Sequence, residues 1–188
     1  QREQYNMMPY GAFEATRSLT TLTFKDGLTY IGGGVMHGGS LTSITLPDSL
    51  EQVAIDAFYC FGEPLHQTIK VVGNNANAKY YTIDDSAFLQ KGTDGDTLLY
   101  FAPASKLKEF VIPQNVKDIN YYAFYSNANL ESVTVPEGIT SLKYGVFSNC
   151  QALKTVSLPI SLTVTRSCNP VNRVVECHGS ISPSISTC

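Results

Sequence analysis

The stretch LKEFVIPQNVKDINYYAF, from Leu107 to Phe124, returns as LESVTVPEGITSLKYGVF from Leu130 to Phe147 and as LKTVSLPISLTV from Leu153. The opening leucines of the three copies, Leu107, Leu130 and Leu153, are equally spaced. Further columns keep the same step: Phe110, Val133 and Val156; Ile112, Val135 and Leu158; Pro113, Pro136 and Pro159; Val116, Ile139 and Leu162. Two more columns, Ile119 with Leu142 and Phe124 with Phe147, keep this step as well. Seven columns in one register indicate a structural repeat, which predicts a stack of similar coils.

Two upstream segments carry the same pattern with a slightly shorter step. They are LTTLTFKDGLTYI from Leu19 and LTSITLPDSLEQV from Leu41. The complete unit reads L-x-x-[VIL]-x-[VIL]-P-x-x-[VIL]-x-x-[IVL]-x-x-x-[AV]-F-x-x-C. The repeat therefore extends over most of the chain.

The spacing within the unit has a physical explanation. The alternation in Leu-x-x-Val-x-Val is typical of a short strand with one buried face, and the following proline ends it because proline cannot donate to a ladder. A second apolar pair, such as Ile139 and Leu142, predicts a return segment of 3₁₀ or irregular form, and an Ala-Phe pair then enters the core. No single unit can bury these residues alone, so neighbours must stack. We predict a mainly β solenoid, a right-handed leucine-rich repeat coil of about six 22–23-residue units.

One coil is longer than the others. Between Ile69 and Leu107 the segments FLQKG and TLLYF flank Thr93-Asp94-Gly95-Asp96, a pattern that predicts an inserted β-hairpin. Near the end, RVVEC from Arg173 to Cys177 predicts a last strand. We therefore expect one solenoid domain over residues 1–188. Its parts are N-terminal repeats at 12–72, a long hairpin-containing coil at 73–106, the C-terminal repeats at 107–163, and a terminal strand and tail at 164–188.

The composition excludes several classes of protein. The 188 residues carry a net charge of −3, which is not the basic surplus of a nucleic-acid binder. They are 43% hydrophobic, too apolar for a disordered acidic tail, and no apolar run is long enough for a transmembrane helix. Ser and Thr number 34 against 29 charged residues, so hydroxyls rather than ions cover much of the predicted surface.

The chain shows no motif of a known catalytic site. It has no G-x-S-x-G, H-E-x-x-H or phosphate-binding loop, and its three histidines, His37, His66 and His178, lie far apart in the repeat. The Asp94-x-Asp96 pattern is better explained as a turn that contains Asp-Gly than as a calcium-binding loop. We predict no enzyme activity, no cofactor and no metal. Among the cysteines, Cys60 and Cys150 are predicted to be buried thiols about 14 Å apart, and the pairing of Cys168, Cys177 and Cys188 stays open.

The stretch VIPQNVKDINYYAFYSNANLESVTVPEGITSLKYGVFSNCQALKTVSLP, from Val111 to Pro159, resembles the BspA-like leucine-rich repeat family. The resemblance covers residues 12 to 163 and the VVECHGSISP segment. It departs from the family pattern at Gly39 and Asn127, where cysteine is usual, and at GGGVMHGG, which lacks the Ala-Phe pair. The resemblance implies a bacterial surface or secreted protein that binds host or neighbouring macromolecules.

Two surfaces are candidate binding sites. The outward strand positions form a hydroxyl ladder of Thr21, Thr23, Ser43, Thr45, Glu109, Ser132, Thr134, Thr155 and Ser157. An aromatic patch is predicted from Tyr121, Tyr122, Tyr125 and Tyr144, to which the hairpin residues Tyr80, Tyr81 and Tyr100 would add. Both patterns have a structural alternative, because threonine suits strands in general and shoulder tyrosines are often half-buried.

These observations predict a non-enzymatic interaction module at the cell surface or outside the cell. The expected partner is a protein of the host matrix or of a neighbouring surface, bound by rigid display of a preformed face. A glycan bound by Tyr and Asn side chains, or a structural spacer within a larger surface protein, are the alternatives. Nucleic acid and a transmembrane segment are not expected.

Overall fold

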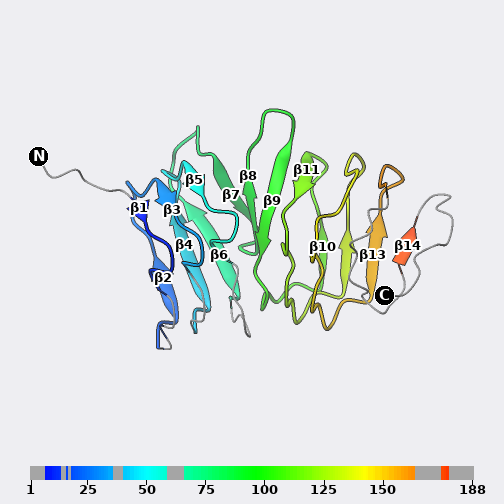
Figure 1. Cartoon of the computed structure of the whole chain (residues 1–188), viewed down its shortest axis with the longest axis horizontal. Coiled ribbons are helices and arrows are strands. Elements are labelled where there is room, and N and C mark those ends of the chain that lie inside the picture. The colour runs from blue at the N-terminus through cyan, green and yellow to red at the C-terminus, as the bar shows by residue number, and fades with distance from the viewer. Residues whose placement is uncertain are drawn as a thin grey trace, which may run out of the picture.

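A computed structural model describes residues 7–13, 16, 18–35, 40–58, 66–163 and 175–177. Every regular element among these residues is a strand, and the strands lie in coils stacked along the long axis of the molecule (Figure 1). The architecture is a β-solenoid of about six turns, which confirms the fold predicted from the repeat.

The first strand of each coil is the one that precedes the proline position. In the N-terminal half these strands are β2 (Thr21–Thr23), β4 (Ser43–Pro47) and β6 (Thr68–Val72); in the C-terminal half they are β10 (Glu109–Val111), β12 (Ser132–Thr134), β13 (Thr155–Leu158) and β14 (Val175–Cys177). They pair in parallel within two separate sheets, β2-β4-β6 and β10-β12-β13-β14. The strand expected at Arg173–Cys177 is confirmed over its last three residues.

The register of these strands follows the repeat. Phe110, Val133 and Val156 are direct partners across β10, β12 and β13, and all three are buried. Because side chains alternate along a strand, the residues on either side of them point outward. The constant period of the sequence thus places one row of apolar side chains inside and two mostly polar rows outside, in which Val111 is an exposed apolar member.

The return segments differ from the sequence prediction in part of the chain. Ile139 and Leu142 lie in irregular backbone, as expected. Elsewhere the return forms short strands: β1 (Met7–Met8), β3 (Tyr30–Ile31) and β5 (Gln52–Val53) make a parallel sheet, and β11 (Val116–Ile119) pairs with the insertion. The prediction of irregular form was wrong there, because inward-facing backbone groups need hydrogen-bond partners and neighbouring coils supply them.

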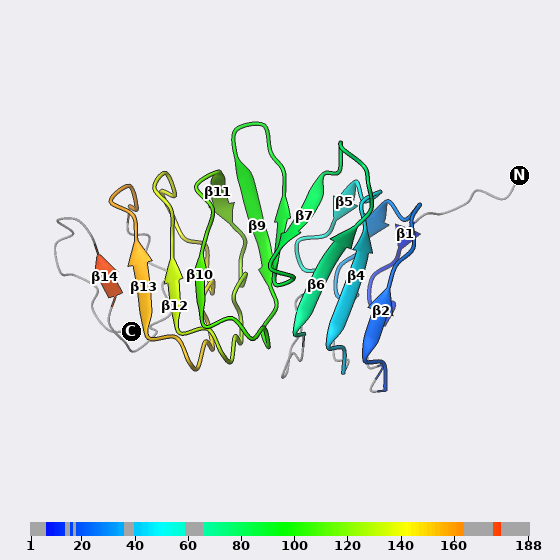
Figure 2. The ribbon, with the colours of Figure 1, turned by 180° about the vertical axis from the view of Figure 1, so that it is seen from behind.

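The insertion contains the predicted hairpin and one strand more. β8 (Ala87–Gln90) and β9 (Asp96–Phe101) are antiparallel, which confirms the hairpin, and β7 (Tyr80–Ile83) extends it on the other side of β8. β9 also pairs in parallel with β11, so the insertion is hydrogen-bonded into the following coil. Both views show these strands between β6 and β10, with the hairpin rising beyond its neighbours (Figures 1 and 2).

The hairpin separates two hydrophobic cores. Ala87 and Leu89 pack into the C-terminal core, whereas Phe88 between them packs into the N-terminal core. β9 divides in the same way, with Phe101 on one side and Tyr100 on the other. Since the hairpin gives one face to each core, it joins the two halves rather than hanging from the stack as a surface loop.

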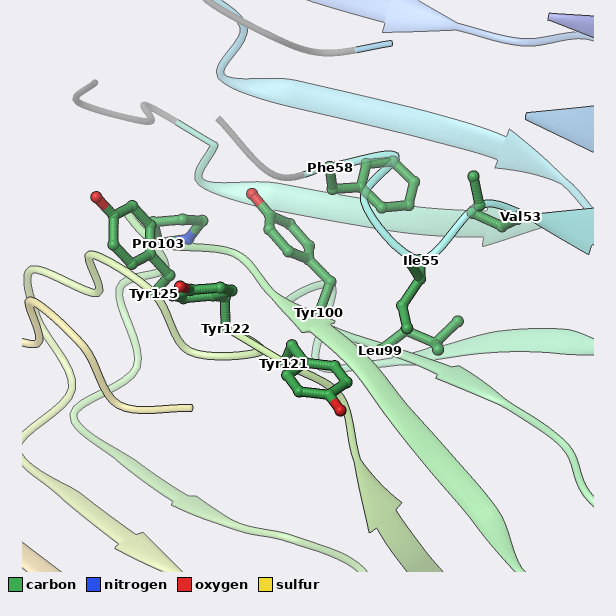
Figure 3. Close-up of a pocket in the computed structure, with 10 residues that line it drawn as sticks. Val53, Ile55, Phe58, Leu99, Tyr100, Pro103, Tyr121, Tyr122 and Tyr125 are labelled. Carbon is green, nitrogen blue, oxygen red and sulfur yellow. The ribbon is translucent and has the colours of Figure 1, made fainter. Parts of the chain in front are cut away.

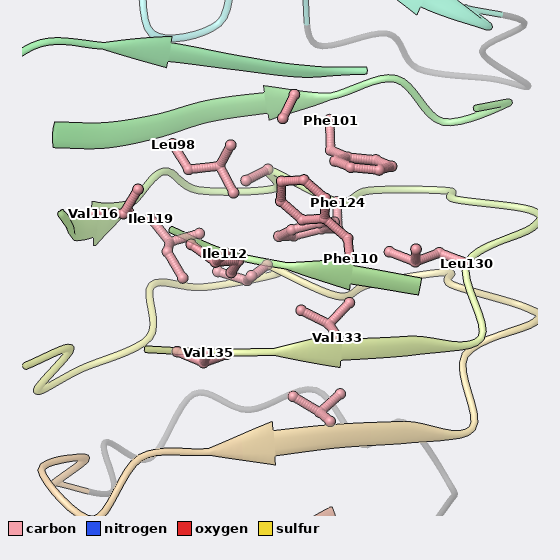
Figure 4. Close-up of a cluster of buried hydrophobic side chains, with 14 of the residues drawn as sticks. Leu98, Phe101, Phe110, Ile112, Val116, Ile119, Phe124, Leu130, Val133 and Val135 are labelled. Atoms are coloured by element: carbon pink, nitrogen blue, oxygen red, sulfur yellow. The ribbon is translucent and has the colours of Figure 1, made fainter. Parts of the chain in front are cut away.

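The C-terminal core is built on phenylalanines from successive coils (Figure 4). The ring of Phe101 lies 5.0 Å from that of Phe124, which in turn lies 5.2 Å from that of Phe147. Leu130, Val133 and similar residues fill the space between the rings. Burying each large apolar side chain contributes about 1.5–3 kcal/mol, so the stack is stabilised coil by coil.

Asn127 and Cys150 occupy the same place in adjacent coils, and the structure explains the exchange. The thiol of Cys150 donates to the carbonyl oxygen of Phe124, and its burial confirms the prediction of a structural thiol. In the preceding coil the Asn127 amide donates to the carbonyl of Ala102, so it too bonds to a backbone carbonyl of the coil before it. Burial raises the pKa of the Cys150 thiol to about 12, which leaves it unreactive near neutral pH.

Several predictions concern residues outside the described ranges: those for Cys60, Cys168, Cys188, His37 and His178. The predicted separation of Cys60 and Cys150 is among them. Cys177 is described only as a strand residue of β14.

Candidate functional site

The hydroxyl ladder forms two blocks rather than one continuous face. In the N-terminal block the rows are Thr21–Ser43–Thr68 and Thr23–Thr45–Lys70; in the C-terminal block they are Glu109–Ser132–Thr155 and Val111–Thr134–Ser157. The insertion separates the blocks, because β6 and β10 belong to different sheets. Sequence reasoning missed Thr68 and Lys70, although Ile69 between them fits the buried column of Ile44.

The ladder residues differ in how much they offer to a partner. Thr21, Thr23, Glu109 and Thr134 are exposed, whereas Ser43, Thr45, Ser132, Thr155 and Ser157 are only partly exposed. Some hydroxyls already have partners within the ladder, since Thr68 Oγ1 donates to Ser43 Oγ at 3.0 Å. The ladder is therefore a mostly small, polar surface.

Charged residues flank the ladder and neutralise one another. Lys108 and Lys154, from the first and third coils of the C-terminal block, both pair with Glu131 between them. Hydrogen bonding from Lys154 lowers the pKa of the Glu131 carboxyl. Lys70 pairs with Asp85 at 2.6 Å. These ion pairs leave no block of a single charge sign beside the described part of the ladder.

A second surface lies at the outer turns that follow the return segments. We call Tyr10, Ile55, Tyr121 and Tyr144 the turn row, because each stands at the same place in its coil, two residues before the Ala-Phe position where that pair is present. Their exposed fractions are 75%, 65%, 49% and 49%, unusually high for large apolar side chains. Ile55 was missed as a site residue, although its spacing from Ala57 matches that of Tyr121 from Ala123.

The four tyrosines predicted as an aromatic patch are brought together as a tyrosine cluster: Tyr121, Tyr122, Tyr125 and Tyr144. The Tyr122 ring lies edge-on to Tyr125 at 5.8 Å and to Tyr144 at 5.6 Å. Lys143 lies over the Tyr121 ring, 5.4 Å from its centre, and also pairs with Asp118. Such edge-to-face contacts hold aromatic rings in defined orientations.

Tyr122 holds a backbone conformation that bulky residues rarely adopt. Its φ of 56° is left-handed, and three other coils place glycine at this position: Gly11, Gly34 and Gly145, with φ of 64°, 60° and 71°. The left-handed region costs a residue with a side chain about 1–2 kcal/mol. Gly145 also makes room for the ring, since an added Cβ there would lie 2.3 Å from Tyr122 Cε1. The repeat alignment of Tyr122 with Gly145 was a visible signal of this exception.

A groove opens beside the tyrosine cluster, where the insertion passes the turns (Figure 3). Ile55 and Phe58 come from the coil before the insertion, and Tyr121, Tyr122 and Tyr125 come from the coil after it. The described residues that line it are Val53, Ala54, Ile55, Phe58, Leu99, Tyr100, Pro103, Tyr121, Tyr122 and Tyr125, and it is open to solvent.

The groove exists because one coil has no outer turn. Here the inserted coil runs as strand β9, whose pairing with β8 shifts register at Leu99, while Ile55 and Tyr121 stand out on either side. Asn120 ties the three coils together, since its Nδ2 donates to the carbonyl of Ile55 at 3.1 Å and to that of Leu99 at 3.4 Å. The groove therefore has a fixed floor and fixed walls.

The hairpin tyrosines do not all join the patch. Tyr80 is buried, and its hydroxyl accepts a hydrogen bond from the Val53 amide. Tyr81 donates to the buried carboxylate of Asp96 at 2.6 Å; burial and then that carboxylate raise the pKa of Tyr81 to about 12. Only Tyr100 reaches the groove, which corrects the expectation that all three add to one surface.

His66 lies behind the groove, against the hydroxyl of Tyr100. The ring is buried, and this burial lowers its pKa to about 4. His66 is therefore neutral near pH 7, and it supports Tyr100 from inside.

The described residues contain no group of three or more His, Cys, Asp or Glu side chains placed to hold a metal ion. Within the same part of the chain, no helix has the length and apolar character needed to cross a bilayer. The arrangement places an apolar groove at the turns and a mostly polar ladder on the strands.

Comparisons with known proteins agree with this architecture. The model of the BspA type leucine-rich repeat region matches residues 6–92 and 99–169, in six copies. The chain is similar in structure to a leucine-rich repeat protein from Eubacterium ventriosum, with a TM-score of 0.71 and 26% identity over 82% of this chain and 40% of that one. It shares its fold with the pneumococcal vaccine antigen PcpA, with a TM-score of 0.66 and 22% identity over 83% of this chain and 39% of that one.

The chain thus spans about 40% of the length of these two structures. No curated protein matched the sequence.

Proposed function

The chain belongs to the BspA type leucine-rich repeat family, and from that premise we propose that it is a non-enzymatic module that binds a protein partner outside the cell through its turn row. Repeats of this type are interaction surfaces in general. The location, on a bacterial surface or secreted, rests on the family resemblance. We also propose that the chain is one solenoid unit, because the hairpin contributes to both cores.

The observation that carries the proposal is the exposure of the turn row. Tyr121, Tyr144 and Ile55 leave about half or more of their surface in water, although each is large and apolar. Tyrosine is enriched in protein interfaces because it combines apolar area with a hydroxyl and loses little conformational entropy on binding. The ordered turns beneath the row lower the cost of ordering a binding surface.

The ladder is a weaker candidate for the main contact. Its side chains are small, and interfaces derive most of their binding energy from a few large anchors. Val111, exposed at 68%, is the largest apolar group on that face. We therefore assign the ladder at most an auxiliary role.

Adhesion of beads coated with the whole chain to surfaces of purified collagen, fibronectin and laminin tests the proposal. The variant Tyr121→Ser/Tyr144→Ser should lose binding, whereas Ile160→Ser, which removes an even more exposed apolar side chain outside the row, should not. Binding that survives the double variant but is lost in Thr134→Lys/Ser157→Lys would move the site to the ladder. Absence of binding to all three matrix proteins would contradict a matrix partner.

A further inference from the structure

We propose that the N-terminal end of the turn row is a cation site, which takes an arginine side chain of the protein partner. The site consists of the exposed ring of Tyr10 and the exposed carboxylate of Asp56, which lie over the glycine turn Gly32–Gly34. This inference rests on the proposed protein-binding function and adds the chemistry of one group that the turn row recognises.

The glycine turn interrupts the row of large side chains at the outer turns. Gly33 stands at the turn-row position of its coil, and the coils on either side carry Tyr10 and Ile55, exposed at 75% and 65%. Neither Gly32 nor Gly33 has a positive φ, so the backbone conformation requires glycine at neither position. What the missing side chains provide is room above the turn.

Side chains from the coils before and after the turn occupy this room. A Cβ added at Gly33 would lie 2.4 Å from Asp56 Oδ1, and one added at Gly34 would lie 3.2 Å from Tyr10 Cζ. The Gly34 amide also donates to the backbone carbonyl of Asp56 at 3.2 Å, which holds the two turns together. Consecutive Cα atoms are about 3.8 Å apart, so the carboxylate and the phenol ring lie over adjacent residues.

The Asp56 carboxylate has no cation beside it in the described part of the chain. Asp118 is paired with Lys143, and Glu131 is paired with two lysines. By contrast, none of the ion pairs or side-chain hydrogen bonds among the described residues involves the carboxylate of Asp56. An unpaired carboxylate beside an aromatic ring attracts positive charge to both groups, so the site favours a cation.

Arginine matches this pair of groups better than a metal ion or lysine does. Its planar guanidinium donates two hydrogen bonds to one carboxylate and also stacks on aromatic rings, whereas lysine is a point charge. A metal ion needs several oxygen ligands, and no group of three or more suitable side chains exists among the described residues. The exposed side chain of Ile55, next to Asp56 in the chain, offers apolar surface to the arginine stem.

Titration of the intact chain with the acetylated, amidated peptide Gly-Gly-Arg-Gly-Gly, followed by ¹H–¹⁵N NMR, tests the inference. Saturable shifts are expected at the amides of Gly33, Gly34 and Asp56, with a dissociation constant of about 1–10 mM because a single side chain makes few contacts. The same peptide with citrulline in place of arginine keeps the shape but not the charge, and it should cause no saturable shift. Equal shifts with both peptides, or none with the arginine peptide, would overturn the inference.

Two variants decide whether binding depends on this carboxylate and on its place over the turn. Asp56→Asn should weaken binding about fivefold, whereas Asp94→Asn, which removes an exposed carboxylate at the hairpin tip, should not. Gly33→Ala keeps every charge and tolerates its φ, but its Cβ would displace the carboxylate, so it should weaken binding as well.

The ¹H–¹⁵N spectrum of each variant also shows whether the chain is folded. Unchanged affinity in a folded Asp56→Asn or Gly33→Ala chain, or equal weakening by Asp94→Asn, would refute the site. Matrix adhesion without binding of the arginine peptide would refute this inference alone. Binding of the arginine peptide without matrix adhesion would refute only the matrix partner.

Discussion

Asn127 offers the sharpest test of how the coils are held together. Its side chain is completely buried; Oδ1 accepts from the amides of Leu130 at 2.7 Å and Asn129 at 3.2 Å, and Nδ2 donates to the carbonyl of Ala102 at 3.2 Å. Replacement by alanine leaves the buried amide of Leu130 without this partner, whereas the carbonyl of Ala102 keeps its hydrogen bond from the amide of Ser105 at 3.0 Å. One orphaned buried group costs about 1–3 kcal/mol, so the free energy of unfolding should fall by about that amount.

The variant Asn127→Cys separates the hydrogen bond that the Asn127 side chain donates from the two that it accepts. A thiol can donate to the carbonyl of Ala102, as Cys150 does to Phe124 at 3.0 Å, but it accepts poorly from the two amides. The loss should therefore be smaller than for Asn127→Ala, by about 1 kcal/mol.

Urea denaturation followed by far-UV circular dichroism measures these differences at pH 7. Asn77→Ala is the matched control, because this asparagine is exposed in a loop and should change stability by less than about 0.5 kcal/mol. The reasoning is refuted if Asn127→Ala unfolds within that margin of the wild type, or if Asn127→Cys is the less stable of the two.

Three further measurements test other parts of the structure. The pKa of His66 is about 4 in the folded chain against an ordinary value of 6.5, so the unfolded chain binds this proton first as the pH falls. The free energy of unfolding should therefore fall by about 3 kcal/mol between pH 6.5 and pH 4 and then level off. Thermal unfolding at several pH values measures this loss, which should be smaller for His66→Gln. Asp96→Asn should lower the pKa of Tyr81 from about 12 toward 10, measured by ultraviolet titration; an unchanged value would mean that burial alone raises it. Gly145→Ala should lower the melting temperature more than Gly27→Ala. Both glycines have a positive φ, but only at Gly145 would an added Cβ press into a tyrosine ring, that of Tyr122. Equal melting temperatures of the two variants would contradict that contact.

The periodic part of the fold was predictable because each coil repeats the same local pattern. The constant step of the repeat predicts which positions pair, and the strand registers of Leu22 with Ile44 and of Phe110 with Val133 follow it. The short return strands were not predictable, since a pair such as Tyr30 and Ile31 carries too little alternation to indicate a strand. Their pairing depends on neighbouring coils.

The candidate site was predictable only in part. Tyr121 and Tyr144 share a repeat column, so their proximity follows from the sequence. Ile55 lies far before Tyr121 along the chain, and nothing in the local pattern places them at one groove. The contact of Asn120 with the carbonyl of Ile55 shows how the structure closes that distance. The hydroxyl ladder was predicted residue by residue, but its division into two blocks was not.

The sequence by itself determined the solenoid, its inner columns and its hydroxyl-rich surface, because these follow from residue types recurring at a constant step. The tertiary structure decided the course of the insertion: whether residues 73–106 would loop outward or pass through the stack. They pass through it as β8 and β9, because Phe88 faces one core and Leu89 the other, and burial on both sides stabilises that path. One outer turn is thereby absent, and the groove beside Tyr122 is the result.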